Sequence, residues 1–413
     1  MPQKHALIYF GDQWDDLWRR RQQLAFHFSR RPEVERVVYV ELPLPLTSLA
    51  RFVAGRADRD AAARWRRALR YGAVTMREGV AVVTPIVPFR LYSGARASAW
   101  NARIAWPQIL RAVAPVHSAQ ANTIFWAGHP YAGLFLRRVS FSLLCYDYTE
   151  DLSTFAHLSP ACRALFADLD QEITRKADLV FTQTQTHFLE KRKVNAHTHL
   201  VPNAADIQRL QAAAALSEPP EMARLPRPRI GYTGSIGYRV DADLLAFIAE
   251  RKPEWSLVLI GPVDNEAVRA RLKPFSNVYV LGYKPYADLG RYLSRIDVGL
   301  IPYRILPEMG NPLKLYDYLA LGKPVVGTPT LGLDPLGEPV AIGRTPTEFV
   351  ALIEHALAEN DPGLVARRKE FASQRSWQAR AEAAWNLVDA CLQARYASQA
   401  KRSGASPECR KGS

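Results

Sequence analysis

A lysine and an aspartate at the start of one predicted helix are the residues of this chain best suited to binding chemistry. Lys314 falls in the first turn of that helix, and Asp317 follows one turn deeper. The free amides and the positive dipole end of a helix N-terminus bind anions, and Lys314 adds a full positive charge there. A carboxylate at Asp317 can accept hydrogen bonds from hydroxyl groups. The pair therefore predicts a diphosphate at the helix start and a ribose over Asp317.

Two buried strands flank this helix and determine where its N-terminus points. Residues 296–302 and the run that begins at Pro324 are apolar, as buried parallel strands are. Pro312 suits the first turn of the helix, and Gly322 suits the left-handed residue just past its end. A helix between two parallel strands begins at the carboxyl edge of the sheet, so the predicted anion site lies at that edge.

A second phosphate-facing turn is predicted within residues 229–241, which read as a strand, a glycine-bearing turn and a helix start. Gly234 lets the backbone approach a ligand closely, Ser235 can cap or donate, and Arg239 can reach a phosphate. Such a turn is common and indicates little on its own. Beside the Lys314 helix it indicates a nucleotide, although Arg239 could also be an ordinary surface arginine.

The nucleotide base is expected near the ends of the neighbouring strands. Gly261 and residues 281–286 would form walls of its pocket, and Tyr283 could stack on the ring. This assignment rests on position alone, and structural packing explains the same residues equally well.

In the first half of the chain, polar residues follow three predicted strands, over residues 7–10, 123–126 and 142–146. The carboxyl ends of parallel strands meet at one edge, so these loops should face the same cleft. The third loop offers three carboxylates that could bind a metal, yet no second set of ligands accompanies them. Binding of hydroxyl groups or capping of the next helix is expected instead. The candidate residues are Gly11 in the first loop, His129 in the second, and Asp147, Glu150 and Asp151 in the third.

The composition is that of a globular protein with a strongly basic first half. Among 413 residues, 48% are hydrophobic and 23% are charged, and no run of about eighteen apolar residues predicts a membrane span. The first residues lack the apolar core of a signal peptide, and four scattered cysteines indicate a reducing cytoplasm without structural zinc. The net charge of +14 divides into +10 over residues 1–201 and +4 over residues 202–413. That asymmetry favours contact with a polyanion or an anionic membrane.

Two arginine-rich segments, at residues 51–70 and 95–113, contribute to this charge. Both interleave arginines with apolar and aromatic residues such as Trp65 and Trp100, as basic amphipathic elements do. One interpretation is docking on anionic lipid near a lipid-linked acceptor. The other, equally open, is a solvated helix face whose aromatic residues pack inward. Nucleic acid is disfavoured because no nucleic-acid-binding motif accompanies the charge.

The stretch from Asn311 to Gly327 resembles the donor-binding helix of retaining GT-B glycosyltransferases of the family-4-like group, also called group 1. Members carry Pro-x-Lys-x-x-Glu-Tyr-Leu-Ala-x-Gly-Lys-Pro-Val-Val at this place, and this chain departs from the pattern twice. The usual glutamate is Asp317, one methylene shorter. The other glutamate of the family's pair would fall at Met309, and Glu308 is one place out of register.

Further segments extend the resemblance over most of the chain. Residues 229–262 and 146–151 are similar to glycosyltransferases of the teichuronic-acid biosynthesis type, and residues 199–206 resemble the family's interdomain hinge. The resemblance implies an α/β fold of the GT-B type, with two Rossmann-like domains facing across a cleft and a C-terminal helix crossing back to the first domain. The implied parts are an acceptor domain (1–204), a nucleotide-sugar donor domain (205–375), a crossing helix (376–399) and a disordered tail (400–413).

The resemblance also implies roles for particular residues. Lys314 and Arg239 would stabilise the leaving diphosphate, and His129 would contact the donor sugar. The implied donor-side residues are Gly11, Gly234, Ser235, Arg239, Tyr283, Glu308, Asn311, Pro312, Leu313, Lys314 and Asp317. The implied acceptor-side residues are Asp15, Arg21, Gln23, Asp147 and Asp151.

The implied function is transfer of a hexose from a UDP- or GDP-linked donor to a glycan or lipid-linked acceptor, in the synthesis of a surface polysaccharide. We expect a cytoplasmic protein, peripheral on the inner face of the membrane, that needs neither a metal nor another cofactor. Two alternatives stay open. One is a nucleotide-sugar 2-epimerase of the same fold, and the other is a catalytically inactive, membrane-associated scaffold.

Overall fold

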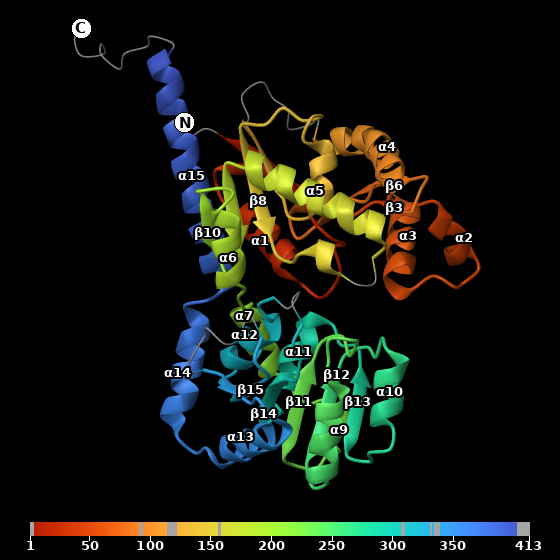
Figure 1. Ribbon diagram of the computed structural model, residues 1–413, viewed down its shortest axis with the longest axis vertical. Helices are drawn as coiled ribbons and strands as arrows, with labels where there is room; N and C mark the ends of the chain where they lie inside the picture. Colours follow the sequence, from red (N-terminus) through yellow and green to blue (C-terminus); the bar gives the residue numbers. More distant parts are fainter. Residues whose placement is uncertain are drawn as a thin grey trace, which may run out of the picture.

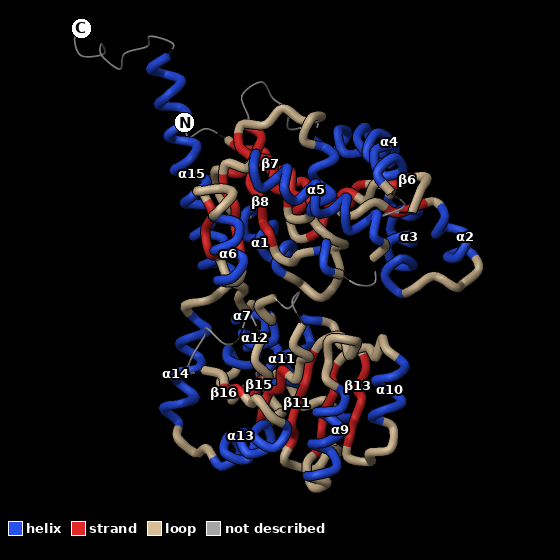
Figure 2. Tube along the Cα trace, in the orientation of Figure 1, coloured by secondary structure: helices blue, strands red, loops and turns tan. Residues whose placement is uncertain are grey.

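A computed structural model of the chain describes residues 4–90, 94–113, 122–155, 158–306, 310–330, 333 and 339–402. Two sheets, each accompanied by helices, form two halves that lie one above the other in Figure 1. Figure 2 shows the strands inside each half and helices around them. The predicted α/β class, with two parallel-sheet halves, is confirmed.

The sheet of the N-terminal half has the strand order β10-β9-β8-β7-β1-β2-β5-β4, and among its described strands only β4 runs antiparallel to its neighbour. The predicted central strands are present because each is a short apolar run that the fold buries on both faces. The edge strands β4 and β10 were not predicted, since they are short and only partly buried. The strands of this half are β1 (His5–Phe10), β2 (Val34–Val40), β4 (Val74–Arg77), β5 (Val80–Val83), β7 (Asn122–Ala127), β8 (Leu143–Tyr148), β9 (Leu179–Thr182) and β10 (Thr198–Leu200), with a separate pair β3 (Leu44–Pro45) and β6 (Ile86–Val87).

The sheet of the C-terminal half has the order β13-β12-β11-β14-β15-β16, and its described pairs are parallel. The predicted strand–helix–strand unit is confirmed: β14 and β15 pair directly, and α12 connects them. Gly322 follows α12 with a φ of +72°, as predicted. Its strands are β11 (Arg229–Thr233), β12 (Ser256–Ile260), β13 (Val278–Gly282), β14 (Val298–Ile301), β15 (Val325–Gly327) and β16 (Ala341–Ile342).

Helices cover both faces of each sheet, and separate apolar clusters lie on the two faces. After the hinge, α7 and α8 pack into the C-terminal half through Leu210 and Met222. The helices are α1 (Arg20–Ser29), α2 (Thr47–Val53), α3 (Arg59–Tyr71), α4 (Ala95–Val113), η2 (Pro130–Phe135), η3 (Leu152–Thr154), α5 (Pro160–Lys176), α6 (Gln185–Arg192), α7 (Ile207–Ala214), α8 (Pro220–Ala223), α9 (Ala242–Arg251), α10 (Glu266–Leu272), α11 (Tyr286–Leu293), α12 (Leu313–Ala320), α13 (Pro346–Ala358), α14 (Pro362–Ser373) and α15 (Trp377–Arg402).

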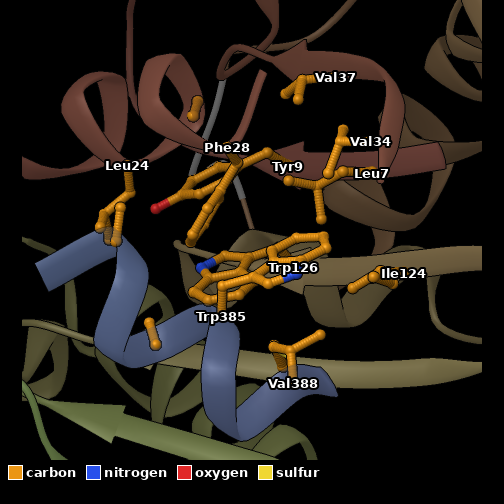
Figure 3. Close-up of a cluster of buried hydrophobic side chains, with 14 of the residues drawn as sticks. Leu7, Tyr9, Leu24, Phe28, Val34, Val37, Ile124, Trp126, Trp385 and Val388 are labelled. Atoms are coloured by element: carbon orange, nitrogen blue, oxygen red, sulfur yellow. The ribbon is translucent and has the colours of Figure 1, made fainter. Parts of the chain in front are cut away.

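The last helix, α15, crosses back from the C-terminal half to the N-terminal half, as predicted (Figure 1). Figure 3 shows Trp385 and Val388 of α15 against Phe28 and Trp126 in one buried cluster. Because tryptophan and phenylalanine bury large apolar areas, this contact ties the chain's end to the first sheet. The helix continues to Arg402, and the rest of the predicted tail lies outside the described residues.

The chain passes between the halves at two places that lie side by side. Ala205 and Ser376 form an isolated parallel bridge, and the Trp377 amide donates to the Ala205 carbonyl at 3.2 Å. The sequence places its domain boundaries at these points, and the boundaries themselves stay a prediction. The arrangement leaves the carboxyl edges of the two sheets facing one another.

Candidate functional site

A cavity of about 610 Å³ lies between the two halves. From the N-terminal half it is lined by residues that follow β1 and β8, such as Arg21 and Glu150. From the C-terminal half it is lined by the turn after β11 and the start of α12, including Arg239 and Lys314. The cavity therefore sits at the carboxyl ends of strands in both sheets, where open parallel sheets bind ligands.

Lys314 is the buried cation of the C-terminal wall. It stands at the start of α12, where Pro312 is the N-cap and no side chain caps the helix. Its Nζ donates to Tyr303 Oη at 2.7 Å and lies 3.8 Å from the centroid of the Tyr232 ring. In the part of the chain that the structure describes, its polar partner is thus a tyrosine and not a carboxylate. Burial lowers the pKa of Lys314 well below its usual value, because the buried cation loses its hydration, and the charge of Asp317 offsets this only in part.

Two glycines keep the backbone close to this lysine. Gly234 has a φ of +120°, and a Cβ there would lie 3.1 Å from Lys314 Nζ. Gly261 has a φ of +152°, and a Cβ there would lie 2.0 Å from the Gly234 carbonyl oxygen. Both positions require glycine, so the turn after β11 can approach the lysine closely. Next to it, the Ser235 hydroxyl lines the cavity and donates to the Asp264 carboxylate.

Asp317 lies one helical turn from Lys314 on the same wall. Its Oδ1 accepts a hydrogen bond from Tyr286 Oη at 2.9 Å. Burial raises the pKa of Asp317 to about 7, with a smaller raising effect from Asp206, while the Tyr286 hydrogen bond and Lys314 act in the opposite direction. A buried carboxylate of this kind gains from hydroxyl groups that donate to it, as a ribose would.

Arg239 faces the N-terminal half across the cavity. Its Nη1 donates to Glu150 Oε1 at 3.1 Å, and its guanidinium carbon lies 5.3 Å from the centroid of the Phe155 ring. Burial alone would lower the pKa of Arg239, but the Glu150 carboxylate and the Tyr238 hydroxyl together outweigh burial and raise it. Arg239 therefore forms an ion pair with the half of the molecule that does not carry it.

The N-terminal wall carries a second guanidinium. Arg21 donates to Asp12 Oδ2 at 2.9 Å and to Thr149 Oγ1 at 2.7 Å, and all three residues line the cavity. Together, Arg21, Asp12 and Thr149 place N–H groups and polar oxygens on this wall of the cavity. These groups can form hydrogen bonds with the hydroxyls of a sugar.

His129 is buried near Arg21 and Asp12, although it does not line the cavity. Its Nδ1 accepts a hydrogen bond from the Tyr131 amide at 3.1 Å. Burial and Arg21 lower the pKa of His129 to about 3, with Asp12 opposing them. The ring is therefore neutral, and because Nδ1 is an acceptor its proton sits on Nε2.

Comparison with known proteins agrees with this geometry. Residues 227–359, which contain β11, α12 and the residues of the C-terminal wall, match the family model described as glycosyl transferases group 1. This part of the chain is a group 1 glycosyltransferase domain. A teichuronic acid biosynthesis glycosyltransferase, TuaH of Bacillus subtilis strain 168, is 29% identical over 157 residues, which is 36% of this chain. The matched part spans 40% of that relative's length.

Solved structures show the fold of the whole chain. Sucrose-phosphate synthase from Thermosynechococcus elongatus superposes with a TM-score of 0.69 at 15% identity, over 95% of this chain and 100% of that chain. HepE of Anabaena, solved with UDP and glucose, superposes with a TM-score of 0.63 at 14% identity, over 93% of this chain and 99% of that chain. Identities this low establish the fold alone, and the predicted GT-B fold is confirmed.

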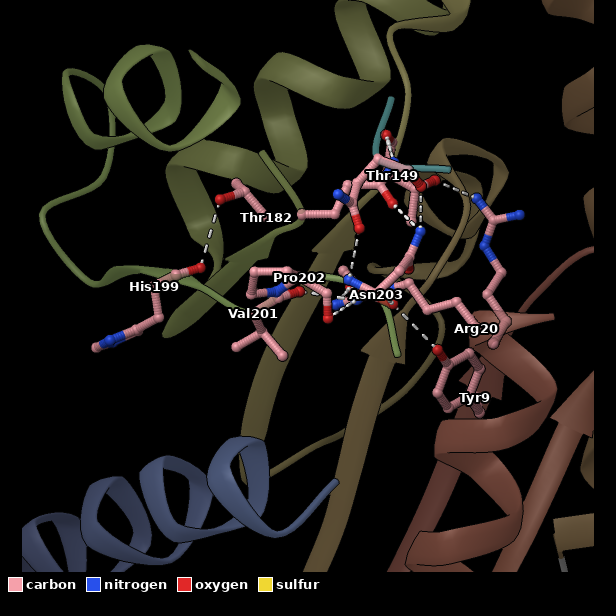
Figure 4. A network of polar contacts seen from close by, with 12 residues as sticks. Tyr9, Arg20, Thr149, Thr182, His199, Val201, Pro202 and Asn203 are labelled. Atoms are coloured by element: carbon pink, nitrogen blue, oxygen red, sulfur yellow. Dashed lines mark hydrogen bonds and ion pairs between the residues drawn. The ribbon is translucent and has the colours of Figure 1, made fainter. Parts of the chain in front are cut away.

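Several residues predicted for the site lie away from the cavity wall, and Asp147 is the clearest case. It is buried in an ion pair with Arg20, whose Nη2 lies 2.7 Å from Asp147 Oδ1. Arg20 also donates to the Val201 carbonyl at 2.8 Å, in the network of Figure 4. This pair fixes α1 and β8 to the hinge.

Two predicted residues of the first loop have structural partners. A Cβ on Gly11 would lie 2.0 Å from Tyr39 Oη, so the residue makes room for that ring. Asp15 accepts from the Leu17 amide and from Arg19, each at 2.9 Å. Their ligand contacts stay a prediction.

Three further residues also lie off the wall. Gln23 Nε2 lies 3.4 Å from Asp206 Oδ2, and Asp151 caps η3 by accepting from the Ser153 amide at 2.9 Å. Helix capping was one of the two predicted roles for Asp151. Tyr283 is not among the residues that line the cavity. Among the described residues, no group of three or more His, Cys, Asp or Glu side chains is placed to hold a metal ion.

The loop before α12 is attached to the hinge. The Asn311 carbonyl accepts from Asn203 Nδ2 at 2.6 Å, and Asn203 Nδ2 also donates to Gln183 Oε1 at 2.8 Å. Asn311, Pro312 and Leu313 line the cavity as predicted for the donor side, and their contacts with a donor stay a prediction. Glu308 lies outside the described residues.

The sequence missed Tyr232 and Tyr303, which line the cavity and contact Lys314. It placed Tyr286 and Glu150 at the cleft but missed the contacts that they make. Tyr286 was expected at the base pocket, and in the structure it donates to Asp317. Glu150 stands in the acidic run after β8, but no local pattern indicates that it meets Arg239, 89 positions away.

Proposed function

We propose that the chain is a retaining glycosyltransferase that uses a UDP- or GDP-linked sugar. The observation that carries this proposal is Lys314, a buried cation without a carboxylate partner at an uncapped helix start inside the cleft. A diphosphate would supply the missing negative charge. The group 1 domain supports the reaction class, and the UDP bound in HepE supports a nucleotide-linked donor.

In the proposed reaction, the bond between the anomeric carbon and the donor diphosphate breaks while an acceptor oxygen attacks from the same face. The acceptor's proton passes to the leaving diphosphate, so no protein nucleophile is needed. Lys314, Arg239 and the first amides of α12 would stabilise the charge that develops on the diphosphate. Asp317 would hold the ribose by accepting its hydroxyl hydrogen bonds.

The N-terminal wall would bind the sugars. His129, which does not itself line the cavity, would orient the donor sugar through its Nε2–H, since Nδ1 is already an acceptor. Arg21, with Asp12 and Thr149, would contact acceptor hydroxyls. The acceptor itself is proposed to be a glycan or a lipid-linked glycan of a surface polysaccharide, a role supported by the likeness to TuaH.

A donor screen tests this function. Purified chain incubated with a panel of UDP- and GDP-linked sugars should release nucleoside diphosphate slowly by hydrolysis, and the anomeric configuration of the released sugar should match that of the donor. We expect turnover to survive EDTA, because the cations of the wall can balance the diphosphate. Release of no nucleoside diphosphate from any donor would contradict the proposal. An isomerised nucleotide sugar formed without acceptor would indicate an epimerase, and activity restored only by magnesium or manganese would move the acids after β8 into a metal role.

The exposed helices of the N-terminal half support a membrane contact. Trp65 and Arg67 of α3 pack inward, with Arg67 paired to Glu41, so the inward-packing interpretation holds for this part. Yet Leu69 on α3 is 65% exposed and Trp100 on α4 is 58% exposed. The helices α2, α3 and α4 lie at the end of the N-terminal half away from α15 in Figure 1. No helix in the described part of the chain is long and apolar enough to cross a bilayer.

We therefore propose that this end of the molecule docks on the anionic inner face of the cytoplasmic membrane, where a lipid-linked acceptor would be found. Each basic residue near such a surface contributes about 1 kcal/mol, and salt screens the attraction. The chain should co-sediment with vesicles that contain anionic lipid at low salt, and less at high salt. The exposed pair Arg96→Glu with Arg103→Glu should lower recovery, whereas Arg251→Glu with Arg367→Glu, exposed in the other half, should not. Equal recovery on neutral and anionic vesicles would refute the electrostatic account.

A further inference from the structure

Glu150 and Arg239 join the two halves of the molecule across the cavity. Glu150 follows β8 of the first sheet and Arg239 follows β11 of the second, and Arg239 Nη1 lies 3.1 Å from Glu150 Oε1. Both residues line the cavity, and their side chains are partly exposed, at 32% for Glu150 and 29% for Arg239. The pair thus lies inside the cleft and not on the outer surface.

The loop that carries Glu150 is held in place on both sides of it. The Thr149 carbonyl accepts a hydrogen bond from Gln183, and the Thr149 hydroxyl accepts one from Arg21. On the other side, Asp151 caps η3. Hydrogen bonds therefore fix the residues on both sides of Glu150, and the loop holds the Glu150 carboxylate against Arg239.

The same loop supplies a second contact. Phe155 is buried, and its ring lies beneath the Arg239 guanidinium at 5.3 Å. A cation over an aromatic face is stabilised, and the planar guanidinium can then offer its N–H groups to an anion beside it. In this structure that anion is the Glu150 carboxylate.

The proposed function gives Arg239 a different anion, the donor diphosphate. A guanidinium can hold a carboxylate or a phosphate with the same N–H groups, and two anions at one place repel each other. Lys314, the other proposed phosphate ligand, is close enough for its charge to act on Arg239 and has no carboxylate partner among the described residues. The two cations therefore differ. Lys314 has no carboxylate in contact among the described residues, whereas Arg239 is paired with the Glu150 carboxylate of the opposite half.

We propose that Glu150 is an internal competitor of the donor diphosphate, which pairs with Arg239 in the free protein and is displaced when the donor binds. This inference rests on the proposed function, since it assigns the phosphate to Arg239. Glu150 would then lower the affinity for the donor. Binding of the donor would also break the Glu150–Arg239 ion pair that joins the two halves. A role in which Glu150 merely orients Arg239 for the donor requires the opposite effect on affinity.

Calorimetric titration with UDP and with GDP tests the competition. The variant Glu150→Gln should bind the diphosphate about two- to fivefold more tightly than the unmodified chain, the range for a partly exposed ion pair. Asp168→Asn, which removes one exposed acid from α5 of the same half, should bind as the unmodified chain does. In an Arg239→Gln background, Glu150→Gln should have no effect, because the competing pair no longer exists.

The outcomes separate this inference from the proposed function. Weaker or unchanged binding by Glu150→Gln would overturn the competition, and so would an equal gain in the Arg239→Gln background. If Arg239→Gln alone leaves diphosphate affinity unchanged, the assignment of Arg239 to the phosphate fails, and the inference fails with it. Thermal unfolding of each variant checks that the fold is retained, which is expected because both side chains are partly exposed.

Discussion

Replacing Lys314 with alanine is expected to weaken binding of UDP or GDP by about 1.5–3 kcal/mol, the range for a charge-assisted hydrogen bond. This corresponds to about a 10- to 150-fold rise in Kd. The loss should be large because the amine is buried between Tyr303 and Tyr232 and has no carboxylate in contact among the described residues. Titration calorimetry at one pH and one salt concentration gives the measurement.

Two further variants make this result specific. Lys314→Met keeps most of the buried stem and removes the charge, so it should lose nearly as much affinity as Lys314→Ala while keeping the packing. Lys273→Ala removes an exposed lysine from the same half and should bind as the unmodified chain does. Unchanged diphosphate affinity in both Lys314 variants would remove the diphosphate from the start of α12.

Binding of the nucleotide is expected to weaken as the pH falls from 8 to 6. Asp317 can accept ribose hydrogen bonds in its ionised form, and burial raises the pKa of this carboxyl to about 7 in the free protein. At pH 6 most molecules would hold a protonated Asp317, so Kd should rise about tenfold relative to pH 8. Tyr286, Asp206 and Lys314 are the other titratable groups around it. Because the ligand phosphate also titrates, the comparison is with Asp317→Asn, whose affinity should be lower at pH 8 and flatter between the two values.

The same substitution should stabilise the folded chain at high pH. A carboxyl whose pKa is raised by folding costs nothing below its unfolded value near 4, where both states are protonated. The cost develops between about pH 4 and 7 and is complete above 7; the shift from 3.8 to about 7 corresponds to at most about 4 kcal/mol. Asp317→Asn should therefore raise the unfolding temperature at pH 8 and raise it much less at pH 4.5. An equal gain at both values would show that the carboxyl is not titrating in this window.

Local patterns were enough to predict the elements that build the donor side. The β14–α12–β15 unit follows from two apolar runs, with Pro312 and Gly322 marking the ends of the helix between them. Lys314 and Asp317 are three residues apart on that helix, so their common wall follows from helical geometry. These features depend on residues that are close together in the sequence, so they can be predicted from the sequence alone.

Contacts between distant loops could not be predicted in the same way. Asp147 has the residue type and the place of a cleft carboxylate, yet Arg20 takes it into a buried ion pair. Nothing in a short window shows that Glu150 lies against Arg239. At the end of β13, the fold places Tyr286 on the wall and leaves Tyr283 off it, a difference that depends on where each side chain points.

A crystal structure of the chain grown with UDP or GDP is the most direct test of the donor site. We expect a diphosphate oxygen within about 3 Å of Lys314 Nζ, further phosphate oxygens at the first amides of α12, and ribose hydroxyls on the Asp317 carboxylate. A nucleotide bound elsewhere, or one in the cavity whose diphosphate does not contact Lys314, would contradict this expectation.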